Sequence, residues 1–201
     1  MSHFIGFCFG DNYEEYLEQY SEELEVEPYI EYTKEEAIDK AKAEHVEAYG
    51  KAMVMVEEGK ELPEYYQNIW NHGIGLTYDE AWEICKEWGY EIDEDTEDLL
   101  STYNPNSKWD WYTEGGRWNA PLILKDGNTA IYATVGEVDW DKTMIPFCFT
   151  SPDGEWFEKG EMGWWCMVDS EKSEDDWKQE FKSFLKYLDE DTTVVAIDFH
   201  I

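Results

Sequence analysis

The two ends of the chain carry the clearest apolar patterns. Residues 4–9 read Phe-Ile-Gly-Phe-Cys-Phe, and the last ten residues, 192–201, are rich in β-branched side chains. Short apolar runs with aromatic and β-branched residues are typical of buried strands. We therefore predict that both termini form core strands of one sheet, in which they can be neighbours.

The first half carries helical patterns that begin at two capping boxes, Thr-Lys-Glu-Glu at residues 33–36 and Thr-Tyr-Asp-Glu at residues 77–80. In each, the threonine can cap the first free amides while the glutamate three residues later reaches back. The first helix is expected to run to about Glu58, a shorter one is expected near residues 13–20, and residues 63–73 are interpreted as a connection. The stripe expected to bury the long helix is Ala41, Val46, Tyr49, Met53 and Val56.

Strand and turn patterns dominate after residue 103. Two hairpins are predicted, at residues 122–133 around Asp-Gly-Asn and at residues 146–157 around Ser-Pro-Asp-Gly, with another strand at residues 163–168. Ser173 is positioned to cap a last helix. Its apolar stripe is Trp177, Phe181, Phe184, Leu185 and Leu188.

These elements predict an α+β fold with a mainly antiparallel sheet that contains both terminal strands. A helical insertion occupies the first half, and the C-terminal helix packs on the sheet. A chain of 201 residues is expected to form a single domain, 1–201. Within it, residues 11–100 are an acidic, mainly helical insertion, and residues 101–201 are an aromatic-rich β/α core.

The net charge of the chain favours some classes of binding partner and disfavours others. The 48 acidic residues against 15 lysines and arginines give a formal net charge of -33. Such a field repels nucleic acid and anionic membranes and attracts basic protein surfaces. No segment approaches the roughly 18 consecutive apolar residues of a membrane-spanning helix, and no export signal is recognisable, so a cytoplasmic location is expected. Acidity that serves only solubility or a salt-adapted host explains the charge equally well.

Dense carboxylates can also form an interaction surface. Rows of carboxylates spaced like backbone phosphates can occupy a lysine- and arginine-lined groove that normally holds nucleic acid. As individual residues, they fit solvated helix faces equally well. The residues assigned to this acidic surface are Glu14, Glu15, Glu22, Glu23, Glu91, Asp93, Glu94, Asp95, Glu97 and Asp98.

The only arginine, Arg117, lies at the end of the densest aromatic segment, residues 104–118. Its guanidinium can bond a phosphate or carboxylate with two parallel contacts, and neighbouring rings can stack on a nucleotide base. A structural role fits as well, in which Arg117 pairs with Asp110 or Glu114 and fixes a loop. The candidate ligand- or partner-binding set is Trp109, Asp110, Trp111, Tyr112, Arg117 and Trp118.

Histidines supply a weaker candidate. His3 and His200 lie near the two termini, and Asp198 shares a strand face with His200. If the terminal strands are neighbours, these three residues can bind a metal or transfer a proton, although strand histidines are more often only hydrogen-bonded. No nucleophile motif, phosphate-binding glycine loop or His-Glu-x-x-His motif occurs, so no catalytic residue and no cofactor are assigned.

Four segments together resemble a group of small acidic proteins encoded by bacteriophages and prophages. They are the start Met-Ser-His-Phe, the block from Ser101 to Trp118, residues 159–165, and the end Asp-Phe-His-Ile. The chain departs from that pattern at Ala120, where a glycine is usual, and at Cys166, where a small residue is usual. The resemblance implies a viral context, and hence the cytoplasm of an infected or lysogenic bacterium, but no activity.

The leading hypothesis from sequence is therefore a non-enzymatic bacteriophage protein that inhibits a host factor. Its expected partner is a host defence protein of the CRISPR or restriction type with a basic nucleic-acid-binding surface, contacted by mimicry of nucleic acid. Direct nucleic-acid contact and membrane contact are not expected, while a homodimer fits exposed aromatics. The alternatives are a nucleotide-binding protein, sponge or enzyme, that uses Arg117 and the tryptophans, and a phage accessory protein with a housekeeping role.

Overall fold

The computed structural model describes residues 2–162 and 168–201. The chain divides into two compact units, which are unit 1 (residues 1–25 and 103–201) and unit 2 (residues 26–102). Each unit has its own hydrophobic core. The predicted α+β class is confirmed, with mainly antiparallel sheets.

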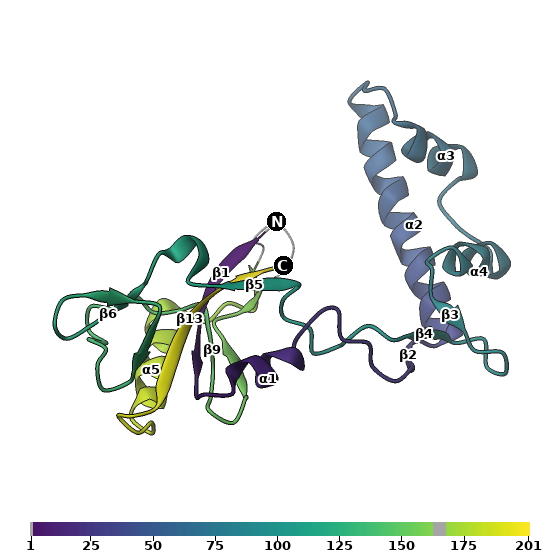
Figure 1. Ribbon diagram of the computed structural model, residues 1–201. Coiled ribbons are helices and arrows are strands. Elements are labelled where there is room, and N and C mark those ends of the chain that lie inside the picture. The colour runs from purple at the N-terminus through teal and green to yellow at the C-terminus, as the bar shows by residue number, and fades with distance from the viewer. Residues whose placement is uncertain (1, 163–167) are drawn as a thin grey trace. The chain divides into compact units, whose positions relative to one another are not determined.

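Unit 1 is built on a sheet that joins both ends of the chain. Its path runs β10 (Trp156–Glu158), β9 (Cys148–Thr150), β1 (His3–Phe9), β13 (Thr193–His200) and β5 (Trp111–Glu114), and β8 (Tyr132–Thr134) also pairs with β13. The terminal strands β1 and β13 lie side by side and antiparallel, as predicted (Figure 1). Only the β1–β9 pairing of this sheet is parallel among the described strands.

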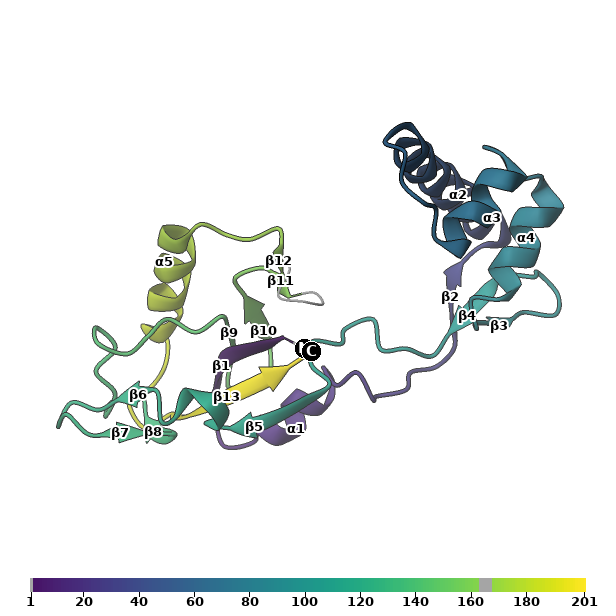
Figure 2. The same ribbon diagram turned by 90° about the horizontal axis from the view of Figure 1, so that it is seen from above.

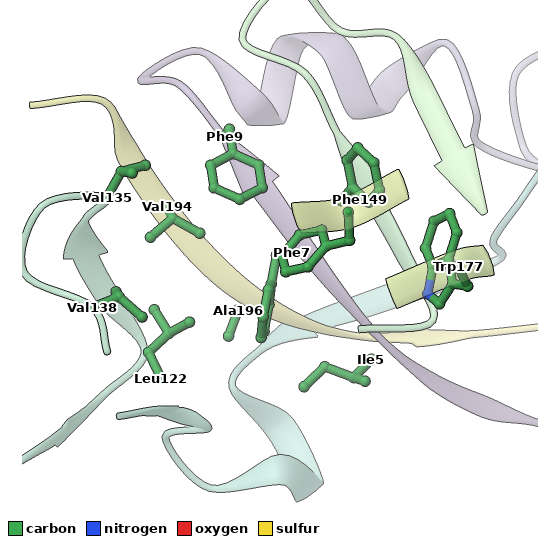
Figure 3. Packing of buried hydrophobic residues seen from close by; sticks show 11 residues of the cluster. Ile5, Phe7, Phe9, Leu122, Val135, Val138, Phe149, Trp177, Val194 and Ala196 are labelled. Atoms are coloured by element: carbon green, nitrogen blue, oxygen red, sulfur yellow. The ribbon is translucent and has the colours of Figure 1, made fainter. Parts of the chain in front are cut away.

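Helix α5 (Glu174–Leu185) covers one face of this sheet, because alternate side chains of β1 and β13 point toward it. Phe7 from β1, Phe149 from β9 and Trp177 from α5 meet in this core (Figure 3). The Trp177 indole N–H donates a hydrogen bond to the Pro146 carbonyl at 2.7 Å, so the polar group of this buried ring has a partner. The predicted packing of the C-terminal helix on the sheet is confirmed.

The short helix α1 (Tyr13–Glu18) covers the opposite face. Its Leu17 is fully buried among Phe4, Cys8 and Phe199. Because this contact holds α1 on the sheet, the segment from residue 11 to residue 25 belongs to unit 1, and the inserted unit begins at Val26 instead of residue 11.

The remaining short elements of unit 1 follow the predicted hairpins. β6 (Leu122–Ile123) pairs with β7 (Thr129–Ala130), and β9 pairs with β10, both antiparallel. The residues predicted to extend the first hairpin form β8 instead and pair with β13 in the main sheet. β11 (Glu161–Met162) pairs with β12 (Val168–Asp169), while the strand predicted at residues 163–168 lies, except for Val168, outside the described residues.

Unit 2 combines three helices with a small sheet. The helices are α2 (Lys34–Glu57), α3 (Glu64–His72) and α4 (Tyr78–Lys86). The sheet has the order β2 (Tyr29–Tyr32), β4 (Leu99–Ser101) and β3 (Glu91–Ile92). Helices α3 and α4 lie along one side of α2 in both views (Figures 1 and 2). Both capping boxes are formed, at Thr33–Glu36 and at Thr77–Glu80.

The predicted buried stripe of α2 is confirmed at Ala41, which is buried, but is wrong at three of its five positions. The side chains that α2 buries are mostly alanines, and Val46, Met53 and Val56 are exposed. Small alanines allow α3 and α4 to pack close to the α2 backbone, and this close approach outweighs the larger apolar area of valine and methionine. The buried residues of α2 are Ala37, Ile38, Ala41, Ala48 and Ala52.

Candidate functional site

Strand register brings the two sequence candidates of unit 1 together. His3 on β1 lies opposite His200 on β13, and His200 lies opposite Trp111 on β5. Directly paired residues share one face of a sheet, so the three side chains form a row on the face that α5 covers farther along. Asp198 occupies the same face two residues before His200.

Asp198 connects this row to Arg117. Its side chain is buried, with 4% exposed, and its Oδ1 lies 3.0 Å from His3 Nδ1. Its Oδ2 accepts a hydrogen bond from the backbone N–H of Arg117 at 3.0 Å and lies 3.8 Å from Arg117 Nε. One buried carboxylate therefore orients a histidine and anchors the loop that carries the arginine.

Asp110 serves the second histidine. Both of its carboxylate oxygens lie within hydrogen-bond distance of His200 Nδ1, at 2.7 and 2.8 Å. The other ring nitrogen, His200 Nε2, is buried and has no hydrogen-bond partner among residues 2–162 and 168–201. Because buried polar atoms nearly always have a partner, this nitrogen is an unusual feature of the site.

Aromatic and cationic groups lie beside these pairs. The Trp111 ring stacks on His200 with centroids 4.7 Å apart, and His3 meets both rings edge-on at 5.4 and 4.8 Å. Trp111 is 44% exposed and the Arg117 side chain is 56% exposed. The Arg117 guanidinium makes no hydrogen bond to any residue that the structure describes. We call this set the histidine–arginine cluster, and it consists of His3, Asp110, Trp111, Arg117, Asp198 and His200.

Two glycines allow Arg117 to reach the sheet. Gly115 and Gly116 have φ of 67° and 48°, a left-handed backbone that favours glycine, and they lead into the 3₁₀ turn η1 (Gly116–Trp118). A Cβ on Gly116 would lie 2.3 Å from Asp198 Cβ, and one on Gly115 would lie 2.7 Å from Ile131. The double glycine therefore lets the backbone pass close enough for Asp198 to bind the Arg117 amide.

The other aromatics of the predicted binding set pack into cores on opposite faces. Trp109 and Tyr112 contact the core under α1, with their ring centroids 5.0 Å apart, and Trp118 packs against the core under α5. The indole N–H groups of Trp109 and Trp118 are also buried without a partner among the described residues. The four rings therefore do not line one cup.

The histidines and aspartates form hydrogen-bonded pairs instead of a shared ligand set. Among the described residues, no group of three or more His, Cys, Asp or Glu side chains could hold a metal ion. A carboxylate on Nδ1 fixes the orientation of an imidazole and leaves Nε2 to accept or donate a proton. His3 is therefore an oriented imidazole that shares Asp198 with the Arg117 guanidinium, while the oriented imidazole of His200 is buried. The sequence predicts the Arg117 segment and the histidines as two separate candidates. The strand pairing shows that they belong to one site.

The predicted acidic surface is partly structural. Asp93 accepts hydrogen bonds from the Asp95 and Thr96 amides, Glu97 pairs with Lys34 at 2.6 Å, and Asp98 accepts from the Lys34 amide at the start of α2. Glu22 is half-buried, and the exposed members of the set are Glu14, Glu15, Glu23, Glu91, Glu94, Asp95 and Glu97. These members lie in both units.

Most lysines are already paired within the chain. Nine of the fourteen lysines form a salt bridge with a described carboxylate. Salt bridges of this kind use few of the 48 acidic residues. Unpaired carboxylates therefore dominate the surface charge. In the described part of the chain, no helix has the length and apolar content required to cross a membrane.

No protein-family model matches the chain, and neither the curated proteins nor the solved structures contain a match. The geometry of the histidine–arginine cluster and the distribution of charge are therefore the grounds on which a function is inferred.

Proposed function

We propose that unit 1 binds a small anionic ligand with an aromatic ring, of the nucleotide type, at the histidine–arginine cluster. The observation that carries this proposal is that exposed Arg117 contacts Asp198, the carboxylate that orients His3, while the exposed ring of Trp111 meets His3 and stacks on His200. A guanidinium with free N–H donors suits a phosphate, and an exposed indole face suits a base.

The charge of the whole chain limits the size of this ligand. Arg117 provides a local positive charge, but the chain carries a net charge of -33. That field opposes a long polyanion more strongly than a ligand with one or two phosphates. A mononucleotide, cyclic nucleotide or cyclic dinucleotide therefore fits better than a nucleic-acid strand.

Calorimetric titration with adenosine monophosphate, cyclic adenosine monophosphate and a cyclic dinucleotide tests this function. We expect one of them to bind and Arg117→Gln to weaken its binding at least tenfold, because the guanidinium is lost while the backbone amide still bonds Asp198. Trp111→Leu should weaken binding as well. The matched control is Lys142→Gln, which removes a cation from a surface salt bridge elsewhere in unit 1. Equal affinity of wild type and Arg117→Gln would contradict the proposal.

The surface charge favours a second function, in which the chain inhibits a host protein. We propose that the unpaired carboxylates bind a basic surface that otherwise holds nucleic acid, as in a CRISPR or restriction effector of the bacterium that a phage infects. The supporting observation is that nine lysines are neutralised internally while most carboxylates are unpaired. Counterion release makes such contacts strong at low salt.

Phage plating on bacteria with a CRISPR or restriction system tests this second function. Expression of the wild-type chain should restore plaque formation, and the combined variant Glu91→Lys, Glu94→Lys and Asp95→Lys should reduce that effect. Arg117→Gln should leave it unchanged, which separates this function from ligand binding. Protection that is equal for the wild type and the charge-reversed variant would contradict mimicry.

A further inference from the structure

The C-terminal half of α2 carries large apolar side chains that the rest of unit 2 does not bury. Val46, Met53 and Val54 are 48%, 42% and 49% exposed. Together with Gly50 they follow helical spacing and lie on one side of α2. Ala48 and Ala52, which are buried, fall on the other side of the helix by the same spacing. We call Val46, Gly50, Met53 and Val54 the α2 apolar stripe.

A shallow, open groove of about 600 Å³ lies beside this stripe, and only α2 and the residues directly after it line the groove. An ideal Cβ placed on Gly50 has no atom within 4 Å, so this part of the groove is free of protein atoms. The two lysines of the groove are held by its own glutamates, Lys51 by Glu47 at 2.6 Å and Lys60 by Glu58 at 2.7 Å. The groove is lined by Glu47, Gly50, Lys51, Val54, Met55, Glu58 and Lys60.

Charge decides which occupant suits the stripe. Unit 2 contains 21 acidic and 6 basic residues, a net charge of -15. A second copy of the chain would bring two such units together, which like-charge repulsion opposes. A partner with apolar side chains flanked by lysine or arginine gains both apolar burial and electrostatic attraction.

We propose that the α2 apolar stripe is a docking surface for a basic amphipathic helix of a partner protein. Residues 46–54 span roughly 12 Å along α2, at about 1.5 Å per residue, so two to three turns of a partner helix would cover the stripe. Apolar anchors three and four residues apart would enter the groove, as in other helix-in-groove complexes. This inference rests on the second proposed function, the binding of a basic host protein, and is independent of the ligand site in unit 1.

Fluorescence polarisation with two labelled 18-residue peptides of leucine and lysine tests the docking surface in the full-length chain. One peptide places its leucines at helical spacing, and the other has the same composition in scrambled order. At a physiological ionic strength of about 150 mM, the helical peptide should bind at least tenfold more tightly than the scrambled one. Gly50→Gln should reduce that binding at least tenfold, because a side chain then fills the groove.

The control is Gly75→Gln, which places the same side chain in unit 2 at a second position with no atom within 4 Å and outside the groove. It should bind the helical peptide like wild type. Gly50→Gln should not unfold α2, because glutamine has a higher helix propensity than glycine. Thermal unfolding of both variants checks this.

Different failures have different meanings. If both peptides bind equally and Gly50→Gln has no effect, the docking surface is overturned while the charge-based function survives. If neither peptide binds, the docking surface is overturned, and phage plating with the charge-reversed variant decides the charge-based function separately. If sedimentation equilibrium shows a dimer that Gly50→Gln dissociates, a second copy is the occupant and the basic helix is overturned.

Discussion

His3 and Asp198 are 195 positions apart in the chain, yet His3 Nδ1 lies 3.0 Å from Asp198 Oδ1. This contact crosses from one terminal strand to the other. The same carboxylate accepts the Arg117 amide, so one residue ties together both ends of unit 1 and the loop of the candidate site.

Asp198→Asn should destabilise unit 1 and weaken its ligand binding. The amide keeps the shape of the side chain but removes its charge. One of the two carboxylate oxygens, which contact His3 Nδ1 and the Arg117 amide, is then replaced by an NH₂ group that cannot accept a hydrogen bond. We expect a loss of about 1–3 kcal/mol in the free energy of unfolding, measured by urea denaturation. The control Asp189→Asn, at an exposed position, should change it little. A loss of equal size in both variants would argue against a special role for Asp198.

Gly116→Ala should be more damaging than Gly127→Ala. Both glycines have positive φ, 48° and 90°, which costs an alanine roughly 1–2 kcal/mol. Only at Gly116 does the new Cβ also collide with Asp198, at 2.3 Å, whereas Gly127 has open space. Thermal unfolding should therefore show a larger drop in melting temperature for Gly116→Ala. Similar melting temperatures for the two variants would mean that the close approach at Asp198 relaxes easily.

Thr77→Ala should remove the side-chain cap of α4, and the resulting loss of stability should depend on pH. Hydrogen bonds from the Thr77 amide and hydroxyl lower the pKa of Glu80 to about 2 in the folded state, from an ordinary value of 4.5. This stabilisation is therefore complete above pH 4.5 and is lost as the pH falls toward 2. At pH 7 the variant should lose about 1 kcal/mol, and its difference from wild type should shrink below pH 4.5.

Urea unfolding between pH 2 and pH 7 measures this difference, and carbon NMR of Glu80 reports its pKa directly. Glu83→Gln on the same helix is the control, since it removes only an exposed pair with Lys86. A Glu80 pKa that is the same in wild type and Thr77→Ala would contradict the capping explanation.

The thiol of Cys8 should be unreactive at pH 8 in the folded protein. Burial raises its pKa to about 12, and burial likewise raises the pKa of Cys148. In a Cys166→Ser background, a thiol reagent should modify Cys8 and Cys148 only after unfolding in urea. Rapid modification of either thiol without urea would contradict their burial.

The same pKa shift predicts loss of stability at alkaline pH. The folded pKa of Cys8 lies above the ordinary value of 9.0, so its stabilising contribution is complete below pH 9 and is lost as the pH rises toward 12. Urea unfolding should show a decline over this range. The decline should be smaller in Cys8→Ala when each protein is compared with its own stability at pH 8.

Local signals in the sequence were sufficient for most elements. The capping boxes at Thr33 and Thr77 predicted where α2 and α4 begin, because the interaction of a threonine with a glutamate three residues later is local. The same locality explains the hairpin turn at Gly127. Helix α3 stands where residues 63–73 predict only a connection, because proline and glycine flank helices as well as loops.

Only the tertiary structure shows which distant segments of the chain contact one another. Composition determined the charge of -33, and periodicity determined the α+β class and the terminal core strands. Neither could show that α2 buries alanines and exposes Val46 and Met53, because the buried face depends on what packs against it. Nor could they join Arg117 to the His3 and Asp198 candidate, since strand register and a two-glycine turn bring these residues together across nearly the whole chain.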